Sequence, residues 1–402
     1  MKVAVLKETQ PGELRVAASP ETVKKLVALG FDVVLESGAG TYAAMTDAAY
    51  QAAGATIAKT AADAAADADI VLKVQRPSLR SEGRDEISLL KPGAILLAML
   101  DPHRNHPTLE ALAGAKIQAF AMEMIPRITR AQGMDVLSSQ ANLAGYKAVL
   151  DAAAEFGRAF PMMMTAAGTV PPARVLVMGA GVAGLQAIAT ARRLGAIVSA
   201  TDVRPAAKEQ VASLGATFVA VDDEEFRQAE TAGGYAKEMS EAYKAKQAAL
   251  IAETIKKQDI VICTALIPGR PAPRLIDAAM VKSMKPGSVI VDLATDTGGN
   301  CELSEADRVV MKNGVTLIGY RNVPARIPVD ASALYARNLL AFLIPLYDQA
   351  AKTLKLNPED EIVKATRLTA EGKIIHPNFL VAAESAAAKS RSPKKPVAKA
   401  EG

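Results

Sequence analysis

The sequence has little of what several classes of protein require. It contains two cysteines and three histidines among 402 residues, and no tryptophan. Two cysteines are too few for a disulfide framework, which favours a reducing compartment. Apolar runs are short, and the run 339–344 is far below the ~18 residues that a membrane span needs. The start, MKVAVLKETQPGE, becomes charged too soon for a signal peptide. We therefore expect a cytoplasmic protein without direct membrane insertion.

A surplus of one charge is also missing from most of the chain. There are 47 basic and 43 acidic residues, a net charge of +4. Residues 385–402 hold five basic residues and one acidic residue, so the rest of the chain is charge-balanced. This excludes a basic body that binds nucleic acid as the default interpretation. The low complexity of residues 381–402 predicts a disordered basic tail.

A metal site is not expected either. His103 and His106 are close together in the sequence, but no third ligand is evident near them.

What is present is an alternation of short β-branched runs with alanine-rich helical stretches. This alternation is typical of α/β domains with parallel sheets. Helices are expected at 20–29 and 185–194. The expected strands are 3–6, 33–36, 70–74, 95–99, 175–178, 197–201, 217–221, 260–263, 289–293 and 316–319.

Two halves of the chain carry the same signals in nearly the same order. Asp69 starts an apolar run that is followed by Lys91-Pro-Gly and another strand; Asp259 starts a run that is followed by Lys285-Pro-Gly. These are also common helix-to-strand turns, which leaves chance similarity open. We interpret them as two related nucleotide-fold units.

Two further helical stretches are expected to connect these units, at 139–156 and 331–351. The fold class is therefore α/β, with two Rossmann-like domains with parallel sheets, joined by long helices and with a cleft between them. Residues 1–137 with 331–380 would form the N-terminal domain, and residues 138–330 the nucleotide-binding domain.

A glycine motif opens the second unit. Gly179, Gly181 and Gly184 form G-x-G-x-x-G between an expected strand and an expected helix, the context that a dinucleotide site requires. The helix N-terminus would face the pyrophosphate. Asp202 ends the next strand, and a carboxylate there binds the ribose hydroxyls and selects NAD over NADP. Arg204 could tolerate a 2′-phosphate, although a place on the adenine side suits it better.

A polar loop precedes the linking helix. Arg127, Gln132 and Asp135 lie within nine residues, and this combination suits a carboxamide and a ribose. Arg127 and Asp135 could pair and hold Gln132. An ordinary charged loop remains the alternative.

A second loop, after the expected strand 217–221, contains Gly233, Gly234 and Tyr235 in a charged stretch. Two glycines beside an aromatic residue suit a mobile lid, and a plain surface loop is the alternative.

These motifs together resemble a known family. KETQPGELRVAASPETVKKL, VQRP, RITRAQGMDVLSSQANLAGYKAV, VMGAGVAGLQAIATARRLGA with TDVRP, and GGYAKEMS are similar to the NAD(H)-binding component (domain I, the alpha-1 subunit) of proton-translocating nicotinamide nucleotide transhydrogenases. The resemblance covers roughly residues 1–380. Alanine dehydrogenases look like the same two-domain scaffold.

The resemblance implies a set of site residues. Arg127, Gln132, Asp135 and Ser138 would position the nicotinamide and its ribose, and Gln132 would also reach toward the partner's nucleotide. Gly234 and Tyr235 would belong to the lid. The remaining residues would hold the pyrophosphate (Gly179, Gly181, Val182, Gly184) and the adenosine side (Asp202, Val203, Arg204, Leu266).

It also implies partners. NAD(H) would bind to this chain, and NADP(H) to a separate subunit that docks on it, with a membrane-spanning subunit to couple proton translocation. The chain would then lie on the cytoplasmic face of the inner membrane through its partners. The segment 159–172, which contains three consecutive methionines, would reach across a homodimer, unless it is only a local turn.

Alanine dehydrogenase is the alternative enzyme. Its relatives place an arginine, a lysine and a histidine where this chain has Arg15, Lys73 and Asp101, so the acid position is broken; His103 is out of register. Hydride exchange between two nicotinamides needs no such acid. Asp296 either lines the site or caps a turn. A non-catalytic NAD-sensing module is a third possibility, which the intact polar loop disfavours.

Overall fold

The chain forms two compact units in the computed structural model. Unit 1 contains residues 1–137 and the chain from Pro328 onward, and unit 2 is Ser138–Ile327. The structure describes residues 1–83, 85–227, 239–267 and 269–380. The expected tail, residues 381–402, and two lid residues, Gly234 and Tyr235, therefore lie outside the described residues.

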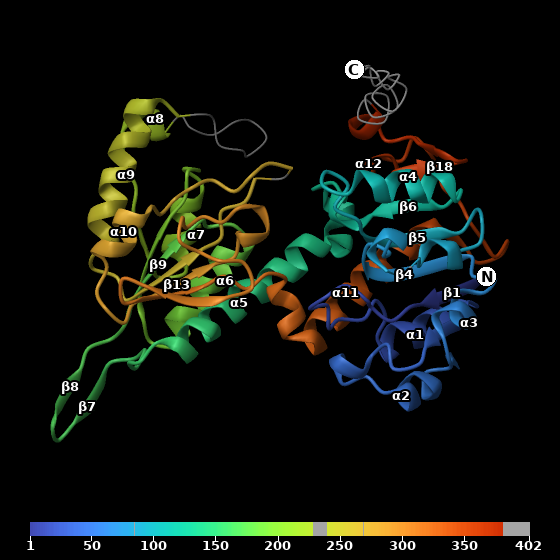
Figure 1. Cartoon of the computed structure of the whole chain (residues 1–402), viewed down its shortest axis with the longest axis horizontal. Helices are drawn as coiled ribbons and strands as arrows, with labels where there is room; N and C mark the ends of the chain where they lie inside the picture. The colour runs from blue at the N-terminus through green and yellow to red at the C-terminus, as the bar shows by residue number, and fades with distance from the viewer. Residues whose placement is uncertain (84, 228–238, 268, 381–402) are drawn as a thin grey trace, which may run out of the picture. The chain divides into compact units, whose positions relative to one another are not determined.

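Unit 1 is built on a six-stranded sheet in which every pairing is parallel. In Figure 1 its strands are blue and cyan, with α4 beside β6. Two short antiparallel ribbons follow late in the chain, β16–β17 (Tyr347–Asp348 with Thr353–Leu354) and β18–β19 (Thr369–Ala370 with Lys373–Ile374). In order across the main sheet the strands are β3 (Thr56–Ala58), β2 (Asp32–Glu36), β1 (Lys2–Val5), β4 (Ile70–Gln75), β5 (Ile95–Met99) and β6 (Gln118–Ala121).

Helices cover this sheet, as crossover connections between parallel strands require. Ser19 caps the first of them by accepting a hydrogen bond from the backbone N–H of Thr22, and Pro20 occupies the first turn, where no N–H is needed. The helices of unit 1 are α1 (Pro20–Ala28), α2 (Asp47–Ala52), α3 (Ala61–Ala65), α4 (His106–Gly114), α11 (Pro328–Leu343) and α12 (Glu361–Thr366).

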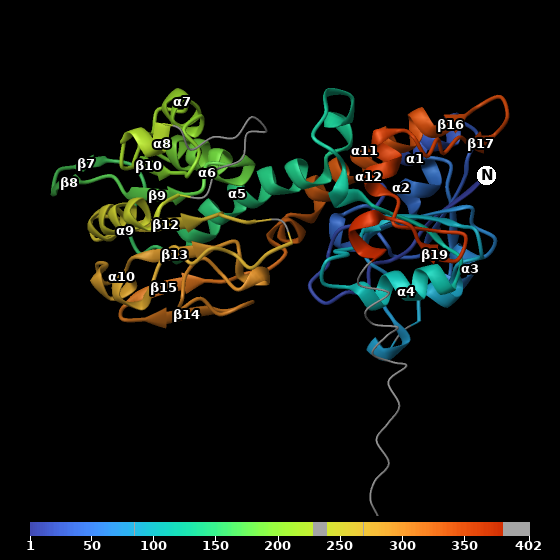
Figure 2. The same ribbon diagram turned by 90° about the horizontal axis from the view of Figure 1, so that it is seen from above.

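Unit 2 is built on a seven-stranded sheet. All pairings are parallel except that of the edge strand β14 with β15. Figure 2 shows β12, β13, β15 and β14 side by side in that order. Across the sheet the strands are β11 (Thr217–Phe218), β10 (Ile197–Thr201), β9 (Arg174–Met178), β12 (Ile260–Cys263), β13 (Val289–Asp292), β15 (Val315–Ile318) and β14 (Val309–Lys312).

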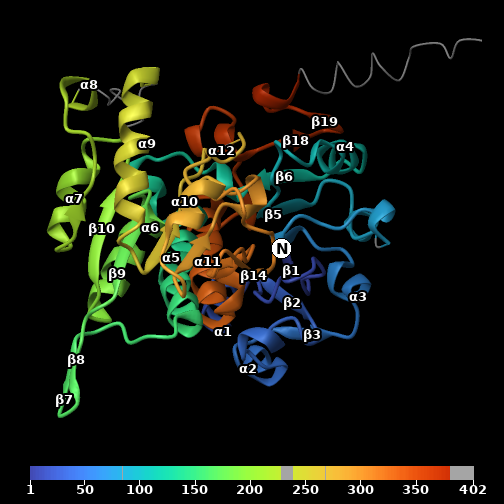
Figure 3. The ribbon, with the colours of Figure 1, turned by 60° about the vertical axis from the view of Figure 1, so that its left-hand side comes forward.

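A hairpin and six α-helices complete the described part of unit 2. The hairpin, β7–β8 (Met163–Thr165 with Gly168–Val170), projects from the rest of the unit in Figures 1 and 3. The helix α5 begins just before the unit boundary. The helices are α5 (Val136–Glu155), α6 (Val182–Arg193), α7 (Ala207–Ser213), α8 (Glu224–Arg227), α9 (Glu241–Ile255) and α10 (Ala278–Ser283).

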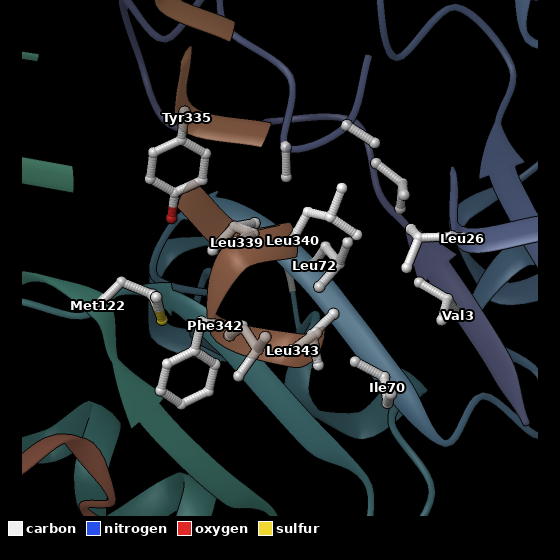
Figure 4. Packing of buried hydrophobic residues seen from close by; sticks show 14 of the residues in the cluster. Val3, Leu26, Ile70, Leu72, Met122, Tyr335, Leu339, Leu340, Phe342 and Leu343 are labelled. Carbon is white, nitrogen blue, oxygen red and sulfur yellow. The ribbon is translucent and has the colours of Figure 1, made fainter. Parts of the chain in front are cut away.

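The core of unit 1 is centred on the late helix α11. Figure 4 shows Leu340 and Leu343 of α11 near Leu72 and Ile70 of β4, and Tyr335, Leu339 and Phe342 of α11 belong to the same buried cluster. The hydroxyl of Tyr335 donates to the backbone oxygen of Lys73 at 2.9 Å. This helix therefore fills a core that the first third of the chain leaves incomplete.

The two units repeat one arrangement, as their shared sequence signals predict. The parallel strands of each sheet, numbered within their unit, have the order 3-2-1-4-5-6, and unit 2 adds one antiparallel edge strand. In unit 1, Asp69 pairs with Lys91 at 2.6 Å and accepts the backbone N–H of Lys2. In unit 2, Asp259 pairs with Lys285 at 3.1 Å and accepts the backbone N–H of Arg174. The repeated ion pair supports a common origin for the units.

Most of the expected helices and strands are present, and the predicted end of one helix is wrong. The helix expected at 331–351 stops at Leu343, and a short 3₁₀ turn through Leu346 follows. Pro345 explains the stop, because proline has no N–H and its ring disfavours a helical residue before it. The strand expected at 217–221 is shortened to Thr217–Phe218.

One helical stretch of the described residues, Pro328–Leu346, is long and apolar enough to cross a membrane by length and composition. Half of it is buried inside the protein, and a buried core helix meets the same criterion.

The buried position of Glu123 in unit 1 leads us to expect that stability depends on pH. One carboxylate oxygen accepts the backbone N–H groups of Leu100 and Asp101, whereas the other is buried without a hydrogen-bond partner in the described part of the chain. Burial raises the pKa of Glu123 to about 7. The folded protein thus holds this proton more tightly than the unfolded chain, and stability falls as the pH rises from about 4.5 to about 7.

We expect Glu123→Gln to remove this fall, because the amide is neutral at every pH. Urea unfolding at pH 5 and pH 8 should show a variant that is more stable than the original by about 1–3 kcal/mol at pH 8 only. Glu359→Gln, at an exposed position, is the control. An equal effect of Glu123→Gln at both pH values would contradict the expectation.

Candidate functional site

The glycine motif of unit 2 lies at the carboxyl end of β9, where its three glycines have different reasons to be glycine. Gly179 has φ +102°, and a Cβ there would lie 2.7 Å from Thr264 Oγ1. A Cβ on Gly184 would lie 1.8 Å from the backbone oxygen of Gly179. A Cβ on Gly181 would meet nothing within 4 Å. Packing within the protein thus requires the first and third glycines, and the open space at the middle one is where a pyrophosphate would approach.

The helix α6 starts directly from this turn. Gly181 is its N-cap residue, and Leu185 N donates to Gly181 O at 2.8 Å. A glycine cap has no side chain to accept hydrogen bonds from the first-turn N–H groups, so these groups suit an anion. Val182, at the first helical position, is 42% exposed. The predicted pyrophosphate residues are therefore gathered at one helix start.

Asp202 joins the glycine turn to the end of β10. One oxygen accepts the backbone N–H of Ala180 at 2.7 Å and Arg204 Nη2 at 3.1 Å. The other oxygen accepts the backbone N–H and Nε of Arg204 at 2.8 and 3.0 Å. Four donors fill the acceptor positions of a carboxylate. The ribose that we expect at Asp202 therefore has to displace a donor, and the guanidinium of Arg204 can move without disturbing a backbone turn.

Exposed apolar residues lie beyond the ends of the neighbouring strands. Val203 follows β10 and is 55% exposed, and Leu266 follows β12 and is 56% exposed. The strands β10, β9 and β12 are adjacent, so their carboxyl ends share one edge of the sheet. The strand order reverses between β9 and β12, which is where α/β sheets bind ligands. Apolar surface at this edge suits the flat face of an adenine.

The polar loop with Arg127, Gln132 and Asp135 lies in unit 1. Arg127 precedes the 3₁₀ helix Thr129–Met134, Gln132 is exposed on it, and Asp135 is its C-cap residue. Ser138 lies in the first turns of α5, at the start of unit 2. The pair that we expect between Arg127 and Asp135 stays a prediction.

Distant residues that the sequence did not reveal hold this loop. Asn338 of α11 donates to the backbone oxygen of Gly133 at 2.8 Å. The guanidinium of Arg130 binds both carboxylate oxygens of Asp360, the N-cap residue of α12, at 2.8 and 3.1 Å. More than 200 residues separate the members of each pair, so no local pattern could have found them.

The residues that flank Gly234 and Tyr235 are described, although these two are not. Ser240 Oγ donates to a carboxylate oxygen of Glu225 at 2.7 Å. The ring of Phe226 is stacked on that of Tyr243, with an interplanar angle of 3°. Figure 3 shows α8 beside α9. The chain on either side of the expected lid is thus pinned together.

The two cations that we expect to match those of alanine dehydrogenases are buried in unit 1. Arg15 is 2% exposed, and its guanidinium binds both oxygens of Glu13 at 2.6 and 2.8 Å. Lys73 is 1% exposed and lies 3.1 Å from Glu86 and 3.5 Å from Glu8. Burial raises the pKa of Glu8 to about 7, against the opposite effect of Lys73. Both cations therefore have carboxylate partners within the protein.

Asp101, at the position where we expect alanine dehydrogenases to have a histidine, is partly exposed. Asp101 follows β5 and pairs with Arg104 at 2.6 Å, and about two-fifths of the Asp101 side chain is exposed. The ring of His103 contacts that of Phe379, with 5.0 Å between their centroids.

Family models match nearly the whole chain. The N-terminal domain model of the alanine dehydrogenase/PNT family matches residues 4–144, and the C-terminal domain model matches residues 148–377. An NAD(P) transhydrogenase alpha-subunit protein of Rhodospirillum rubrum is 62% identical over 377 residues, which cover 94% of this chain and 98% of that protein. The alanine dehydrogenase of Mycobacterium tuberculosis is 31% identical and covers 87% of this chain and 88% of its own length.

Solved structures agree with these similarities. A crystal structure of transhydrogenase from Sinorhizobium meliloti superposes with a TM-score of 0.84 at 58% identity, over 93% of this chain and all of that one. An L-alanine dehydrogenase superposes with a TM-score of 0.80 at 25% identity, over 96% of this chain and 99% of that one.

Gly145 provides a test of how the start of α6, the expected pyrophosphate site, is positioned. A Cβ on Gly145 of α5 would lie 2.0 Å from the backbone oxygen of Ala183, in the first turn of α6. We expect Gly145→Ala to push the start of α6 away, lowering the free energy of unfolding by about 1–3 kcal/mol and weakening NADH binding.

Gly157→Ala is the matched control, because a Cβ there would meet nothing within 4 Å. Thermal unfolding and NADH fluorescence measure the two effects. A stable Gly145→Ala variant that binds NADH normally would show that α6 does not need this close approach.

Proposed function

The chain belongs to the alanine dehydrogenase/PNT family, and from this premise we propose that it is the NAD(H)-binding component of a proton-translocating transhydrogenase. The transhydrogenase alpha subunits among its relatives support this. The observation that carries it is the open space at Gly181, at the start of α6 and at the reversal of strand order between β9 and β12. NADH bound there passes a hydride from C4 of its nicotinamide to NADP⁺ on a separate subunit, and in the reverse direction NADPH on that subunit passes a hydride to NAD⁺ bound here.

The proposed roles follow the two groups of residues. Gly179, Gly181, Val182 and Gly184 hold the pyrophosphate. The adenosine side is held by Asp202, Val203, Arg204 and Leu266.

Positioning of the nicotinamide is proposed for the polar loop. Arg127, Gln132, Asp135 and Ser138 orient the ring and its ribose, and Gly234 and Tyr235 cover it as a lid. Direct hydride exchange requires two C4 atoms about 3–3.5 Å apart and aligned, with water excluded. An amide that binds without exchanging protons suits that requirement.

Alanine dehydrogenation fits the geometry less well. Arg15 and Lys73, which would bind a keto acid, are buried and paired with carboxylates. The position of the acid is Asp101, which is engaged with Arg104. Reduction of an imine or keto acid needs a proton donor at the reacting carbon's substituent, whereas hydride exchange between nicotinamides does not.

The proposed partners are a second copy of the chain, an NADP(H)-binding subunit and a membrane-spanning subunit that couples proton translocation. The hairpin β7–β8 supports the homodimer, because Met163 and Met164 of β7 are 43% and 79% exposed, and Met162, directly before β7, is 61% exposed. Three adjacent exposed methionines form an adaptable apolar surface that suits burial. The chain then lies on the cytoplasmic face of the membrane through its partners.

One assay separates the two enzymes. The purified chain is mixed with an NADP(H)-binding transhydrogenase subunit, and reduction of an NAD analogue by NADPH is followed. We expect turnover only when both proteins are present. Turnover of pyruvate, ammonia and NADH by the chain alone would instead establish an alanine dehydrogenase.

Gln132→Asn tests the positioning role of the amide. The shorter side chain keeps the same polar groups but withdraws them by one methylene, so NADH affinity should change less than twofold while hydride transfer slows by about 10–100-fold. NADH fluorescence measures binding, since no tryptophan interferes, and stopped-flow absorbance measures transfer. Gln51→Asn, at an exposed position in α2, is the control. Equal losses of binding and transfer would reduce Gln132 to a binding residue.

A further inference from the structure

Asn300 is a fully buried polar residue at the carboxyl edge of the unit 2 sheet. Its side-chain oxygen accepts the backbone N–H of Ala265 at 3.1 Å. Its side-chain nitrogen donates to the backbone oxygens of Ala265 and Pro273 at 2.9 and 2.8 Å. One side chain thus ties together the outgoing and returning arms of the loop that follows β12. Leu266, the expected adenine contact, is next to Ala265 in that loop.

Asp292 fixes the backbone turn that contains Asn300. Asp292 ends β13, is fully buried, and accepts the backbone N–H groups of Ala294 and Cys301, each at 2.9 Å. Gly299 has φ +80°, and a Cβ there would lie 2.9 Å from a carboxylate oxygen of Asp292. The turn on either side of Asn300 is therefore held closely around this carboxylate, which fixes the backbone from which the Asn300 side chain extends.

Because Leu266 is exposed, its position depends on the hydrogen bonds that Asn300 makes to the loop. A leucine that is more than half exposed gains little from packing within the protein, so packing cannot fix its position. The three hydrogen bonds of Asn300 fix the backbone of the preceding residue instead. Without them, two carbonyl oxygens and one N–H group in a partly buried place lose their partner, and the loop moves to regain hydrogen bonds.

We propose that Asn300 is a positioning residue for the adenine half of the cofactor, and that it acts through the loop that carries Leu266. The inference rests on the proposed function, because it takes NAD(H) as the ligand. The inference extends that proposal in two ways. Adenine recognition depends on a residue that follows the next strand, β13, and the residues that recognise the adenine are separate from those that position the nicotinamide.

Asn300→Ala is the first test, with three probes: NADH, AMP and reduced nicotinamide mononucleotide. The affinities for NADH and AMP should fall by about tenfold, and by the same factor, because both contain the adenosine. The affinity for the mononucleotide should stay within twofold of the original. With the partner subunit present, the KM for NADH should rise while kcat is retained.

A double-mutant cycle identifies the route. If Asn300 acts through Leu266, then Leu266→Ala weakens AMP binding in the original protein and adds little in the Asn300→Ala background. Additive losses would show that the two residues act separately and would overturn the proposal. Asn357→Ala, at an exposed position in unit 1, is the control and should alter none of the three affinities.

Asn300→Ser is the second variant, in case Asn300→Ala does not fold, since a hydroxyl can keep one of the three hydrogen bonds. Equal weakening of AMP and of the mononucleotide, in a variant that melts as the original does, would mean that Asn300 does not act selectively on the adenine half. An original protein that binds no NADH would defeat the proposed function itself, whereas unchanged AMP affinity in the variants would defeat only the role of Asn300.

Discussion

The proposed nucleotide site depends on one close approach, that of helix α6 to the end of strand β9. A Cβ on Gly184 would lie 1.8 Å from Gly179 O, so the helix starts where no side chain fits. Three neighbours maintain this approach: Thr264 Oγ1 donates to Gly179 O at 2.9 Å, Asp202 binds the backbone of Ala180, and Gly145 lets α5 contact the first turn of α6. The helix dipole and the first-turn N–H groups face the sheet edge only because all of these contacts hold.

The other unit shows what the same fold does without that approach. Unit 1 has the same order of parallel strands and the same Asp–Lys pair. In both units this pair lies at the amino ends of the strands, away from the glycine turn of unit 2. After β1, however, the chain runs for 14 residues before α1 begins, whereas only three residues separate β9 from α6. Glu8, Lys73 and Glu86 form a buried ion cluster beside the carboxyl ends of β1 and β4. The sheet edge that we propose to bind a nucleotide in unit 2 is thus occupied, in unit 1, by a buried cluster of ion pairs.

Local patterns in the sequence predict most strands of the two sheets, the glycine turn and the position of Asp202, because each depends on residues that are close along the chain. The short strands β3, β6 and β14 were not predicted. The end of the helix expected at 331–351 was wrong because Pro345 outweighs a continuing apolar pattern. Asn338, Asp360 and Asn300 could not be found, since each contacts a loop from a distant part of the chain. An isolated asparagine has no periodicity, and its role appears only when the fold brings its partners to it.

The arrangement at Asp202 adds a constraint to the simple picture of a ribose-binding carboxylate. Its four acceptor positions are filled, two by backbone N–H groups and two by the guanidinium of Arg204. The backbone donors belong to the turns themselves and cannot leave without undoing them, so a ribose hydroxyl bound as proposed would exchange with an Arg204 N–H. A hydroxyl can take that place because it donates to the carboxylate. A 2′-phosphate cannot, because it has only acceptor oxygens and its negative charge would meet the carboxylate. In the proposed site, Asp202 would therefore discriminate between nucleotides by which group can replace a guanidinium donor, and Arg204 would compensate the buried carboxylate until that exchange occurs.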